Sequence, residues 1–491
     1  MRARSTAAVS SIIAITVLTS AIVVAPAPSD AAACPVPAAA AGQPAWPPSP
    51  PDGAFDIAHF GEAHYNEGQG SITVPILVQD LIAYEPDLVA FSSDMADIGT
   101  ADRMECFRDL MGPLLAAGIP WFDAPGNHDR LTVADTFGGV ASEGIGPWRE
   151  TFAPMPAPWG DGPAAGPGFV LPTGEPDDGP GAATHYFFDY GPAGEPVVRL
   201  IALDNSRHSF TLTDVDQYPA VGPGARDASQ LAFFQRAAAD ADERGLLTFA
   251  MFHEPTQDPR DQTKAYPISY NHSMAKGATA DNLLFDALAV ATGTDAVLLG
   301  HILGNFQYAV GDVPYFIDGG AGGSPYTREE TGTDSGYFYA YRLLRLFPED
   351  GGWSFRTYVI PLVDHIELDA PANATIGEQL SLAATAVQPY DPTLPPRFPL
   401  MPDGAIRVAL RAPSPSVLDG DAVPPVAYMW STSDHDVLRP IPDPSLDPSD
   451  DPAFDPATMT TSGRFEAVGQ GQATITITTG THTQTVTITV T

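Results

Sequence analysis

The sequence predicts an α/β fold followed by an all-β segment. Between Ala54 and Leu299, short apolar runs typical of buried strands alternate with stretches of helical periodicity, which favours helices packed against a sheet. From about residue 364 this alternation gives way to Thr- and Val-rich runs with a period of two, which are typical of half-buried strands. A chain of 491 residues is long enough for two or three domains.

The first residues have the pattern of an export signal. Arg2 and Arg4 precede an apolar run over residues 7–24, and small residues follow at 31–33 as a cleavage site. We therefore expect residues 1–33 to be a signal peptide and residues 34–53 to be a Pro- and Ala-rich spacer. No later run of about 20 apolar residues predicts a membrane span. We expect a soluble protein that is secreted or otherwise extracytoplasmic.

The net charge and the cysteine content limit the kinds of partner and of attachment that we expect. The net charge is −37 and the pI is near 4.3, so the protein repels nucleic acids and anionic membranes, and we expect no nucleic-acid docking surface. The two cysteines, Cys34 and Cys106, are able to pair in an oxidising compartment. Because Cys34 directly follows the small residues, lipid anchoring through it is the alternative, and the sequence leaves both open.

The first predicted strand ends in two polar side chains. An apolar run over residues 54–60 predicts a buried strand, and Glu62 and His64 follow it. In an extended segment, residues two positions apart point to the same side of the chain. A carboxylate and an imidazole at this spacing suit a metal ion.

Acidic residues follow the second predicted strand. Helical periodicity extends over residues 74–84, and the apolar run over residues 86–91 predicts another buried strand. Asp94 and Asp97 come directly after this run. Carboxyl ends of parallel strands are where α/β sheets place their ligands, so both carboxylates are candidate site residues.

The third predicted strand precedes an amide and an imidazole. Residues 103–117 predict an amphipathic helix, and residues 118–122 predict a strand that leads into Asn127 and His128. A Gly-Asn pair is also ordinary turn chemistry. The order strand, helix, strand, helix, strand nevertheless places this pair next to the earlier carboxylates.

A long segment without periodicity separates two groups of predicted strands. Residues 132–183 are rich in Gly and Pro, which predicts a surface or lid insertion. Its Trp148 and Trp159 are more typical of packing anchors than of ligand contacts. Strands are predicted at residues 185–190 and 197–204, followed by a helix over residues 228–243.

Two more histidines follow two more predicted strands. The apolar run over residues 246–252 ends at His253, and the run over residues 296–299, after a helix over residues 282–291, leads to His301. A lone histidine is more often a satisfied polar residue than a ligand. The repetition of polar residues after successive strands favours a shared site instead.

Eight side chains at predicted strand ends form the candidate site: Glu62, His64, Asp94, Asp97, Asn127, His128, His253 and His301. Carboxylate, amide and imidazole ligands together suit hard or borderline divalent ions such as Mn, Fe or Zn. Because several strands contribute ligands, two ions are expected.

The ordered motifs resemble those of the calcineurin-like metallophosphoesterases. They are Gly-Glu-x-His, Ser-Asp-x-x-Asp, Gly-Asn-His-Asp, His-x-Pro and Gly-His-x-Leu, and we expect residues 54–362 to form this domain. The resemblance implies a two-sheet metallophosphoesterase sandwich flanked by helices. It also implies a hydrolase that cleaves phosphomonoesters or phosphodiesters with metal-activated water, with a small phosphate ester as substrate.

The resemblance assigns ligand roles by position. Asp94 would bridge two ions, and Asn127, His253 and His301 would complete the shell of the second ion. We call these four residues the second site. Every motif position of the second site carries the residue type that the family uses.

The motif positions of the first ion depart from the family pattern. Glu62 and His64 would hold this ion, and we call them the first site. The family has Asp at the position of Glu62 and a further histidine at position 303. Leu303 stands there and cannot ligate a metal. We therefore expect the first site to bind weakly, to be filled by water, or to be rescued by Asn305.

The remaining two site residues have implied catalytic roles. His128 would act as an acid or charge stabiliser above the leaving group, and Asp97 would orient it. The alternative function is a catalytically degenerate member of the fold that serves as a binding or cell-surface protein, with Leu303 as its signature. A serine hydrolase is disfavoured because no Gly-x-Ser-x-Gly motif occurs.

The C-terminal part, residues 363–491, resembles bacterial Ig-like domains of the Big-2 type. The similar stretches are residues 428–434 and 463–471, and the alternating runs at 473–478 and 484–490 predict a hairpin. The resemblance implies an all-β sandwich that acts as a spacer or makes cell-surface contact.

Overall fold

The computed structural model describes residues 46–66, 69–130, 146–152, 169–170, 185–192, 195–206, 210, 229–259, 280–323, 336–389, 406–410, 423–441 and 454–491. The described residues belong to one compact unit, residues 34–491. The predicted signal peptide, the spacer up to residue 45 with Cys34, and most of the 132–183 insertion lie outside the described residues. Cys106 is buried and disulfide-bonded.

The first sheet has the strand order β12-β11-β1-β2-β3. Its strands are β1 (Phe55–Phe60), β2 (Leu88–Phe91), β3 (Trp121–Asp123), β11 (Ala340–Glu349) and β12 (Gly352–Pro361). Strands β1, β2 and β3 are parallel, and β11 is antiparallel to β1. The parallel strands are connected by helices α1 (Gly70–Tyr84) and α2 (Ala101–Ala116), as the sequence predicted. The carboxyl ends of β1, β2 and β3 therefore meet at one edge.

The second sheet has the strand order β4-β5-β6-β7-β8-β10-β9. Its strands are β4 (Phe169–Val170), β5 (Tyr186–Tyr190), β6 (Val198–Ala202), β7 (Leu247–Met251), β8 (Ala296–Leu299), β9 (Asn305–Val310) and β10 (Val313–Asp318). Strands β6, β7, β8 and β10 are parallel. Helices α4 (Ser229–Glu243) and α5 (Ala280–Ala291) precede β7 and β8. Short helices η1 (His128–Arg130) and α3 (Gly146–Phe152) follow β3.

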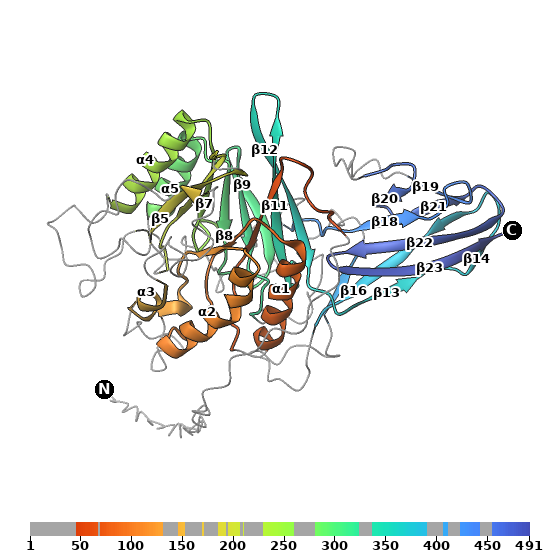
Figure 1. Cartoon of the computed structure of the whole chain (residues 1–491), viewed down its shortest axis with the longest axis horizontal. Coiled ribbons are helices and arrows are strands. Elements are labelled where there is room, and N and C mark those ends of the chain that lie inside the picture. Colours follow the sequence, from red (N-terminus) through yellow and green to blue (C-terminus); the bar gives the residue numbers. More distant parts are fainter. Residues whose placement is uncertain are drawn as a thin grey trace, which may run out of the picture. The chain divides into compact units, whose positions relative to one another are not determined.

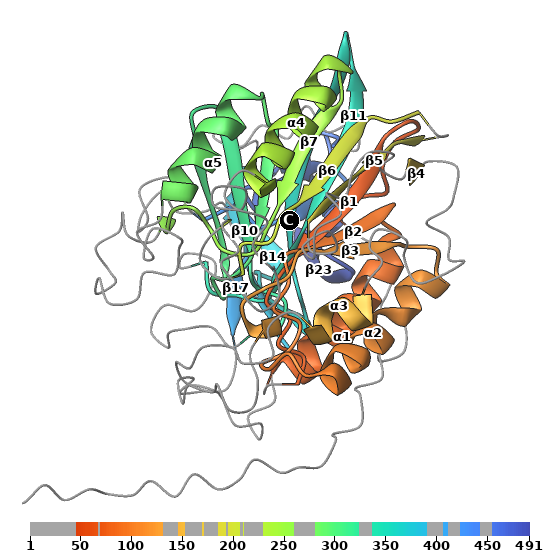
Figure 2. The ribbon, with the colours of Figure 1, turned by 90° about the vertical axis from the view of Figure 1, so that its left-hand side faces the viewer.

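Two hydrophobic cores explain why the strands of the second sheet are apolar on both faces. In β7, Phe249 and Met251 belong to the core shared with the first sheet, whereas Ala250 belongs to the core beneath α4 and α5. Strand β8 divides in the same way, because successive side chains point to opposite faces. Figure 2 shows α1–α3 on one side of the two sheets and α4 and α5 on the other. The predicted α/β sandwich is confirmed as an arrangement of two sheets flanked by helices.

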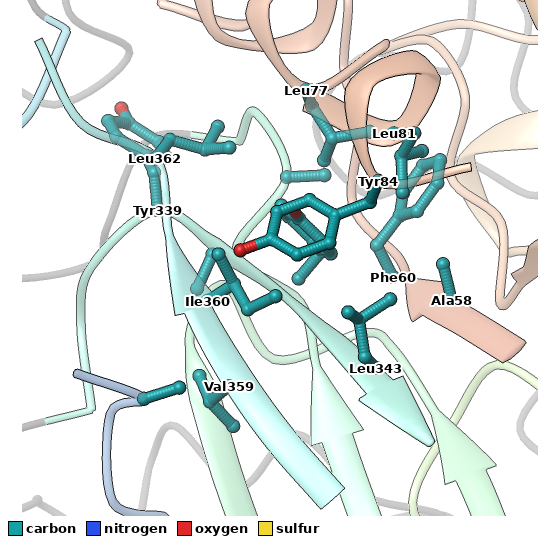
Figure 3. Close-up of a cluster of buried hydrophobic side chains, with 14 of the residues drawn as sticks. Ala58, Phe60, Leu77, Leu81, Tyr84, Tyr339, Leu343, Val359, Ile360 and Leu362 are labelled. Carbon is teal, nitrogen blue, oxygen red and sulfur yellow. The ribbon is translucent and has the colours of Figure 1, made fainter. Parts of the chain in front are cut away.

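The core of the first sheet is packed by helix α1. Leu77, Leu81 and Tyr84 of α1 lie over Phe60 of β1 and Leu343 of β11 (Figure 3). The Tyr84 hydroxyl donates a hydrogen bond of 2.6 Å to the carbonyl oxygen of Trp46. This packing anchors the strands whose ends carry the polar motifs.

The C-terminal part consists of strands, drawn in cyan and blue in Figure 1. They form sheets β13-β16-β17, β14-β23-β22-β18-β20 and β15-β21-β19. Their bounds are β13 (His365–Asp369), β14 (Asn373–Ala374), β15 (Gln379–Ser381), β16 (Ala383–Val387), β17 (Arg407–Ala409), β18 (Met429–Thr432), β19 (Leu438–Pro440), β20 (Met459–Thr460), β21 (Arg464–Ala467), β22 (Gly471–Thr479) and β23 (His482–Val490). The predicted hairpin is β22–β23. No helix within the described ranges is long and apolar enough to cross a membrane.

Candidate metal centre

Four of the predicted ligands have a left-handed backbone. The φ angles are 59° at Glu62, 38° at His64, 60° at Asp94 and 65° at His301. Residues other than glycine rarely adopt this conformation, and such strain persists mainly where the surrounding structure imposes it, often at functional sites. Each of the three loops that follow β1, β2 and β8 therefore bends sharply to present its side chain.

The second site is assembled around the Nε2 atom of His253. This atom lies 2.9 Å from Oδ1 of Asn127 and 3.2 Å from Oδ2 of Asp94. Nδ1 of His301 lies 3.2 Å from the same Nε2 and 2.9 Å from Oδ1 of Asn127. Asp94, His253 and His301 thus form a group whose ligand atoms could hold one ion.

A second group shares Asp94 and lies on the side of the first site. His64, Asp94 and His128 offer ligand atoms that all lie within 4.8 Å of one another. Nε2 of His64 lies 3.0 Å from Oε2 of Glu62 and 3.9 Å from Oδ2 of Asp94. The structure brings Glu62, His64 and Asp94 together.

His128 and Asp97 are adjacent at the rim of the cluster. Nδ1 of His128 donates a hydrogen bond of 2.9 Å to the backbone oxygen of Asp97 and lies 3.5 Å from its carboxylate. The backbone N–H of His128 donates to Oδ1 of Asp94 at 2.8 Å. Nδ1 therefore carries a proton, and this hydrogen bond fixes the orientation of the His128 ring relative to Asp97.

Leu303 is buried, with an exposed fraction of 4%, beside the first site. A Cβ on Gly323 would stand 2.3 Å from Cδ2 of Leu303 and 3.0 Å from the His64 ring, so apolar carbon packs next to this histidine. The side-chain nitrogen of Asn305 donates to the carbonyl oxygen of Phe338 at 2.7 Å. The amide of Asn305 is thus held by the chain before β11.

Asp129 joins the two loops that follow β2 and β3. Its buried carboxylate accepts hydrogen bonds from the backbone N–H of Asp94 at 3.2 Å, Met95 at 3.1 Å and Gly126 at 2.7 Å, and from the Ser93 hydroxyl. Burial and the nearby charge of Asp94 raise the pKa of Asp129 to about 6, although the hydrogen bonds that its carboxylate accepts partly offset them. The sequence reasoning missed Asp129 as a positioning residue, although it follows His128 directly.

Asn205, which follows β6, holds the backbone of the loop after β7. Its side-chain oxygen accepts from the N–H of His253 at 3.1 Å and of Glu254 at 3.0 Å, and its nitrogen donates to the Glu254 carbonyl at 2.7 Å. Nearby, the buried Arg130 guanidinium contacts the Asp204 carboxylate at 2.6 Å. Asn205 follows a predicted strand, which was the signal that could have identified it.

A buried network of hydrogen bonds and an ion pair holds the His253 ring in position. Nδ1 of His253 donates to the backbone oxygen of Ser92 at 2.9 Å, which directs Nε2 toward the ligand cluster. The Ser92 hydroxyl lies 3.1 Å from His59, and His59 lies 2.7 Å from the Asp318 carboxylate. Arg342 pairs with Asp318 at 2.9 Å. Such outer partners fix the orientation of ligating histidines.

Opposite charges dominate the electrostatics of the cluster. Burial opposes ionisation of Asp94, but the charges of His253, His128 and His64 outweigh it and lower the pKa of Asp94. Burial disfavours protonation of His253, yet the charges of Asp94 and Glu62 raise its pKa to about 10. A carboxylate held ionised at the centre of a histidine cluster is suited to a cation.

The donor set fits divalent metal ions. The side chains that meet in this small volume are two carboxylates, one amide oxygen and four imidazoles, each imidazole from a different loop that follows a strand. This mixture suits Mn, Fe or Zn. The fold and the ligand groups together define an α/β sandwich with a metal centre at the carboxyl ends of its strands.

Comparison with known families agrees with this class. The family model of the calcineurin-like phosphoesterases matches residues 55–305, about half of the chain. The chain therefore belongs to the calcineurin-like phosphoesterase family, which is a class of metal-dependent hydrolases of phosphate esters. Comparison with curated proteins gave no match.

Three solved structures are similar to this chain at low sequence identity. The GAP50 anchor of the inner membrane complex of Plasmodium is 10% identical, with 63% of this chain and 85% of that chain covered and a TM-score of 0.41. Purple acid phosphatase PPD1 from yellow lupin (Lupinus luteus) seeds is 16% identical, with 64% and 52% covered and a TM-score of 0.41. The phosphopantetheinyl hydrolase PptH from Mycobacterium tuberculosis is 12% identical, with 53% and 87% covered and a TM-score of 0.27. The chain thus spans about half of the lupin enzyme.

Proposed function

We propose that this protein hydrolyses small phosphomonoesters or phosphodiesters with water activated at the candidate metal centre. The observation that carries the proposal is that Asp94 is shared by two side-chain groups, one with His253 and His301 and one with His64 and His128, and of these His128 would serve as the acid and not as a ligand. When bound, divalent ions would lower the pKa of a coordinated water and neutralise the charge of the phosphate.

The side chains around the ions would position the ester and supply a proton. The second site would hold the tighter ion because its residue types are intact. His128, as the imidazolium, would donate a proton to the leaving oxygen from Nε2, and the backbone oxygen of Asp97 would hold the ring through Nδ1. Asp129 and Asn205 would hold the loops that carry the metal ligands in position.

The first site would bind an ion weakly. Its missing histidine position carries Leu303, whose side chain is apolar and buried. This asymmetry also supports the alternative function, a phosphoesterase fold that has lost catalysis and serves as a binding or cell-surface protein. Turnover distinguishes the two functions.

The regions outside the phosphoesterase domain belong to the same proposal. We propose a signal peptide at residues 1–33, secretion or extracytoplasmic localisation, and an Ig-like domain at residues 363–491 that makes cell-surface contact. The export pattern of the first residues and the Thr- and Val-rich strands of the C-terminal part support these assignments. The disulfide bond at Cys106 supports its pairing with Cys34, the other cysteine of the sequence, over lipid anchoring through Cys34.

The test combines metal content with turnover on one sample. Elemental mass spectrometry of the purified protein would give the number of ions per chain, and monoester and diester substrates would be assayed in parallel. Turnover that a chelator abolishes and Mn²⁺ restores would support the hydrolase. Absence of turnover after supply of Mn²⁺ or Fe²⁺ would favour the binding protein.

A further inference from the structure

We propose that Arg130 is a positioning residue that clamps the turn carrying His128 to the second sheet. This clamp, formed by Arg130 with Asp204 and Ser206, would set where the proton donor stands relative to the metal centre. The inference rests on the proposed function in one respect, because it takes His128 as the acid that protonates the leaving group.

The turn that carries His128 has little backbone support of its own. Helix η1 is a single 3₁₀ turn, and the hydrogen bond from the N–H of Arg130 to the carbonyl oxygen of Asn127 is 3.3 Å long. Turns of this kind have poorer hydrogen-bond geometry than an α-helix. The turn also follows β3, which is the outermost strand of the first sheet. The position of His128 therefore depends mainly on contacts outside the turn.

The Arg130 side chain supplies such a contact. Its guanidinium is buried, Nη2 donates to Oδ2 of Asp204 at 2.6 Å, and Nε donates to the Ser206 hydroxyl. The same hydroxyl donates to Oδ1 of Asp204 at 2.5 Å. Solvent screens a buried ion pair much less than an exposed one. Because the donors of a guanidinium lie in a rigid plane, two simultaneous hydrogen bonds fix the direction of the side chain as well as its reach.

Residues 204–206, which follow β6, are anchored in the second sheet. The N–H of Asp204 donates to the side-chain oxygen of Gln230 in α4 at 2.5 Å, and the Gln230 nitrogen donates back to the Asp204 carbonyl at 2.9 Å. Asn205 accepts the N–H of His253 at 3.1 Å. This segment therefore contacts the η1 turn and the loop after β7, although β3 and β7 belong to different sheets.

The clamp should matter most for His128. A bound ion would itself tie Asn127 to His253, whose side chains approach within 2.9 Å. His128 would make no bond to the ion, and the backbone oxygen of Asp97 holds only its ring. A displacement of about one ångström can cost about 100-fold in rate. Loss of the clamp should therefore impair proton transfer more than ion binding.

Leaving groups of different basicity test the clamp in the metal-loaded protein. p-Nitrophenyl phosphate releases a stable anion, whereas phenyl phosphate depends on an acid. The variant Arg130→Met with Asp204→Asn removes both charges, so that neither is left buried alone. At saturating Mn²⁺, kcat should fall by about tenfold or more for phenyl phosphate and by about threefold or less for p-nitrophenyl phosphate. Diphenyl and bis(p-nitrophenyl) phosphate give the same comparison for a diesterase.

The matched control is Arg345→Met with Asp56→Asn. Arg345 and Asp56 form a buried pair with two hydrogen bonds of 2.9 Å, near the start of β1 and away from its carboxyl end. This variant should change the two rates by the same factor. An equal loss for both esters in the Arg130 and Asp204 variant would overturn the proposal. Arg130→Lys keeps the charge but loses the rigid fork, so it should recover part of the rate for phenyl phosphate.

Hydrogen exchange of the metal-free protein tests the clamp without turnover. Arg130→Met with Asp204→Asn should reduce protection in peptides that contain His128 and also in peptides that contain His253, on the other sheet. A loss confined to residues 126–130 would overturn the proposal. Circular dichroism checks folding, and Arg130→Lys carries the same comparisons if the double variant does not fold. If the wild type hydrolyses none of the esters, the proposed function fails, and the exchange result alone decides the clamp.

Discussion

The α-carbon of Gly126 lies against the carboxylate of Asp94, so that a Cβ at position 126 would stand 2.1 Å from Oδ1 and 2.5 Å from the backbone nitrogen of Asp94. The same Oδ1 accepts the N–H of His128. Only glycine therefore allows the loops after β2 and β3 to approach this closely.

Gly126→Ala should displace Asp94 and weaken metal binding. We expect a loss of about 10–100-fold in Mn²⁺ affinity, because the added methyl group must move either the carboxylate or the loop. The matched control is Gly112→Ala in helix α2, where nothing lies within 4 Å of the added Cβ. That control should keep full affinity and add up to about 1 kcal/mol to the free energy of unfolding. Equal affinities in the two variants would contradict the prediction.

His128→Asn should reduce turnover far more than metal content. The imidazole contacts Asp97 through Nδ1, and its loss removes the proton donor while the second site stays complete. We expect kcat to fall by about 100-fold or more, as is typical for loss of a general acid. Elemental mass spectrometry of the same sample should show unchanged metal. A parallel loss of metal and turnover would assign His128 to the ligands instead.

Asn205→Ala should destabilise the loop that carries His253. The substitution leaves the buried N–H groups of His253 and Glu254 without their acceptor. We expect the free energy of unfolding to fall by about 1–3 kcal/mol, together with weaker Mn²⁺ binding. Denaturant unfolding with and without Mn²⁺ measures both effects. Asn373→Ala, exposed on β14, is the control and should change neither quantity.

Asp80→Asn should stabilise the protein at pH 8 but not at acidic pH. Burial raises the pKa of Asp80 to about 7, although a hydrogen bond from the Thr481 hydroxyl partly offsets this. The unfolded chain releases this proton near its ordinary pKa of about 4, below the value in the folded protein. The free energy of unfolding therefore falls as pH rises from about 4 to about 7.

The amide in Asp80→Asn does not ionise, so the gain in melting temperature over the wild type should grow between pH 5 and pH 8. Calorimetric scans across this range measure the difference. Asp350→Asn, on the exposed turn between β11 and β12, is the control and should show a difference that does not depend on pH. A constant difference for Asp80→Asn would contradict the prediction.

Most of the phosphoesterase fold could be predicted from the chain alone. The apolar runs at residues 54–60 and 246–252 became β1 and β7, and the helical periodicity at residues 228–243 became α4. These predictions succeed because a strand between two packed layers must be apolar on both faces. Strands β11 and β12 complete the first sheet, although they lie far along the chain from β1. Their own residues do not indicate that β11 pairs with β1.

The sequence by itself determined which residue types stand at the strand ends and in which order. It also showed that position 303 carries leucine, because motif order and residue identity do not depend on packing. Only the tertiary structure decided that Glu62 reaches His301 and that Asp129 and Asn205 hold the ligand loops. These relationships join residues up to 239 positions apart. They depend on hydrogen bonds, which form only when the donor–acceptor distance lies within a range of less than about one ångström. Residue spacing along the chain does not specify such distances.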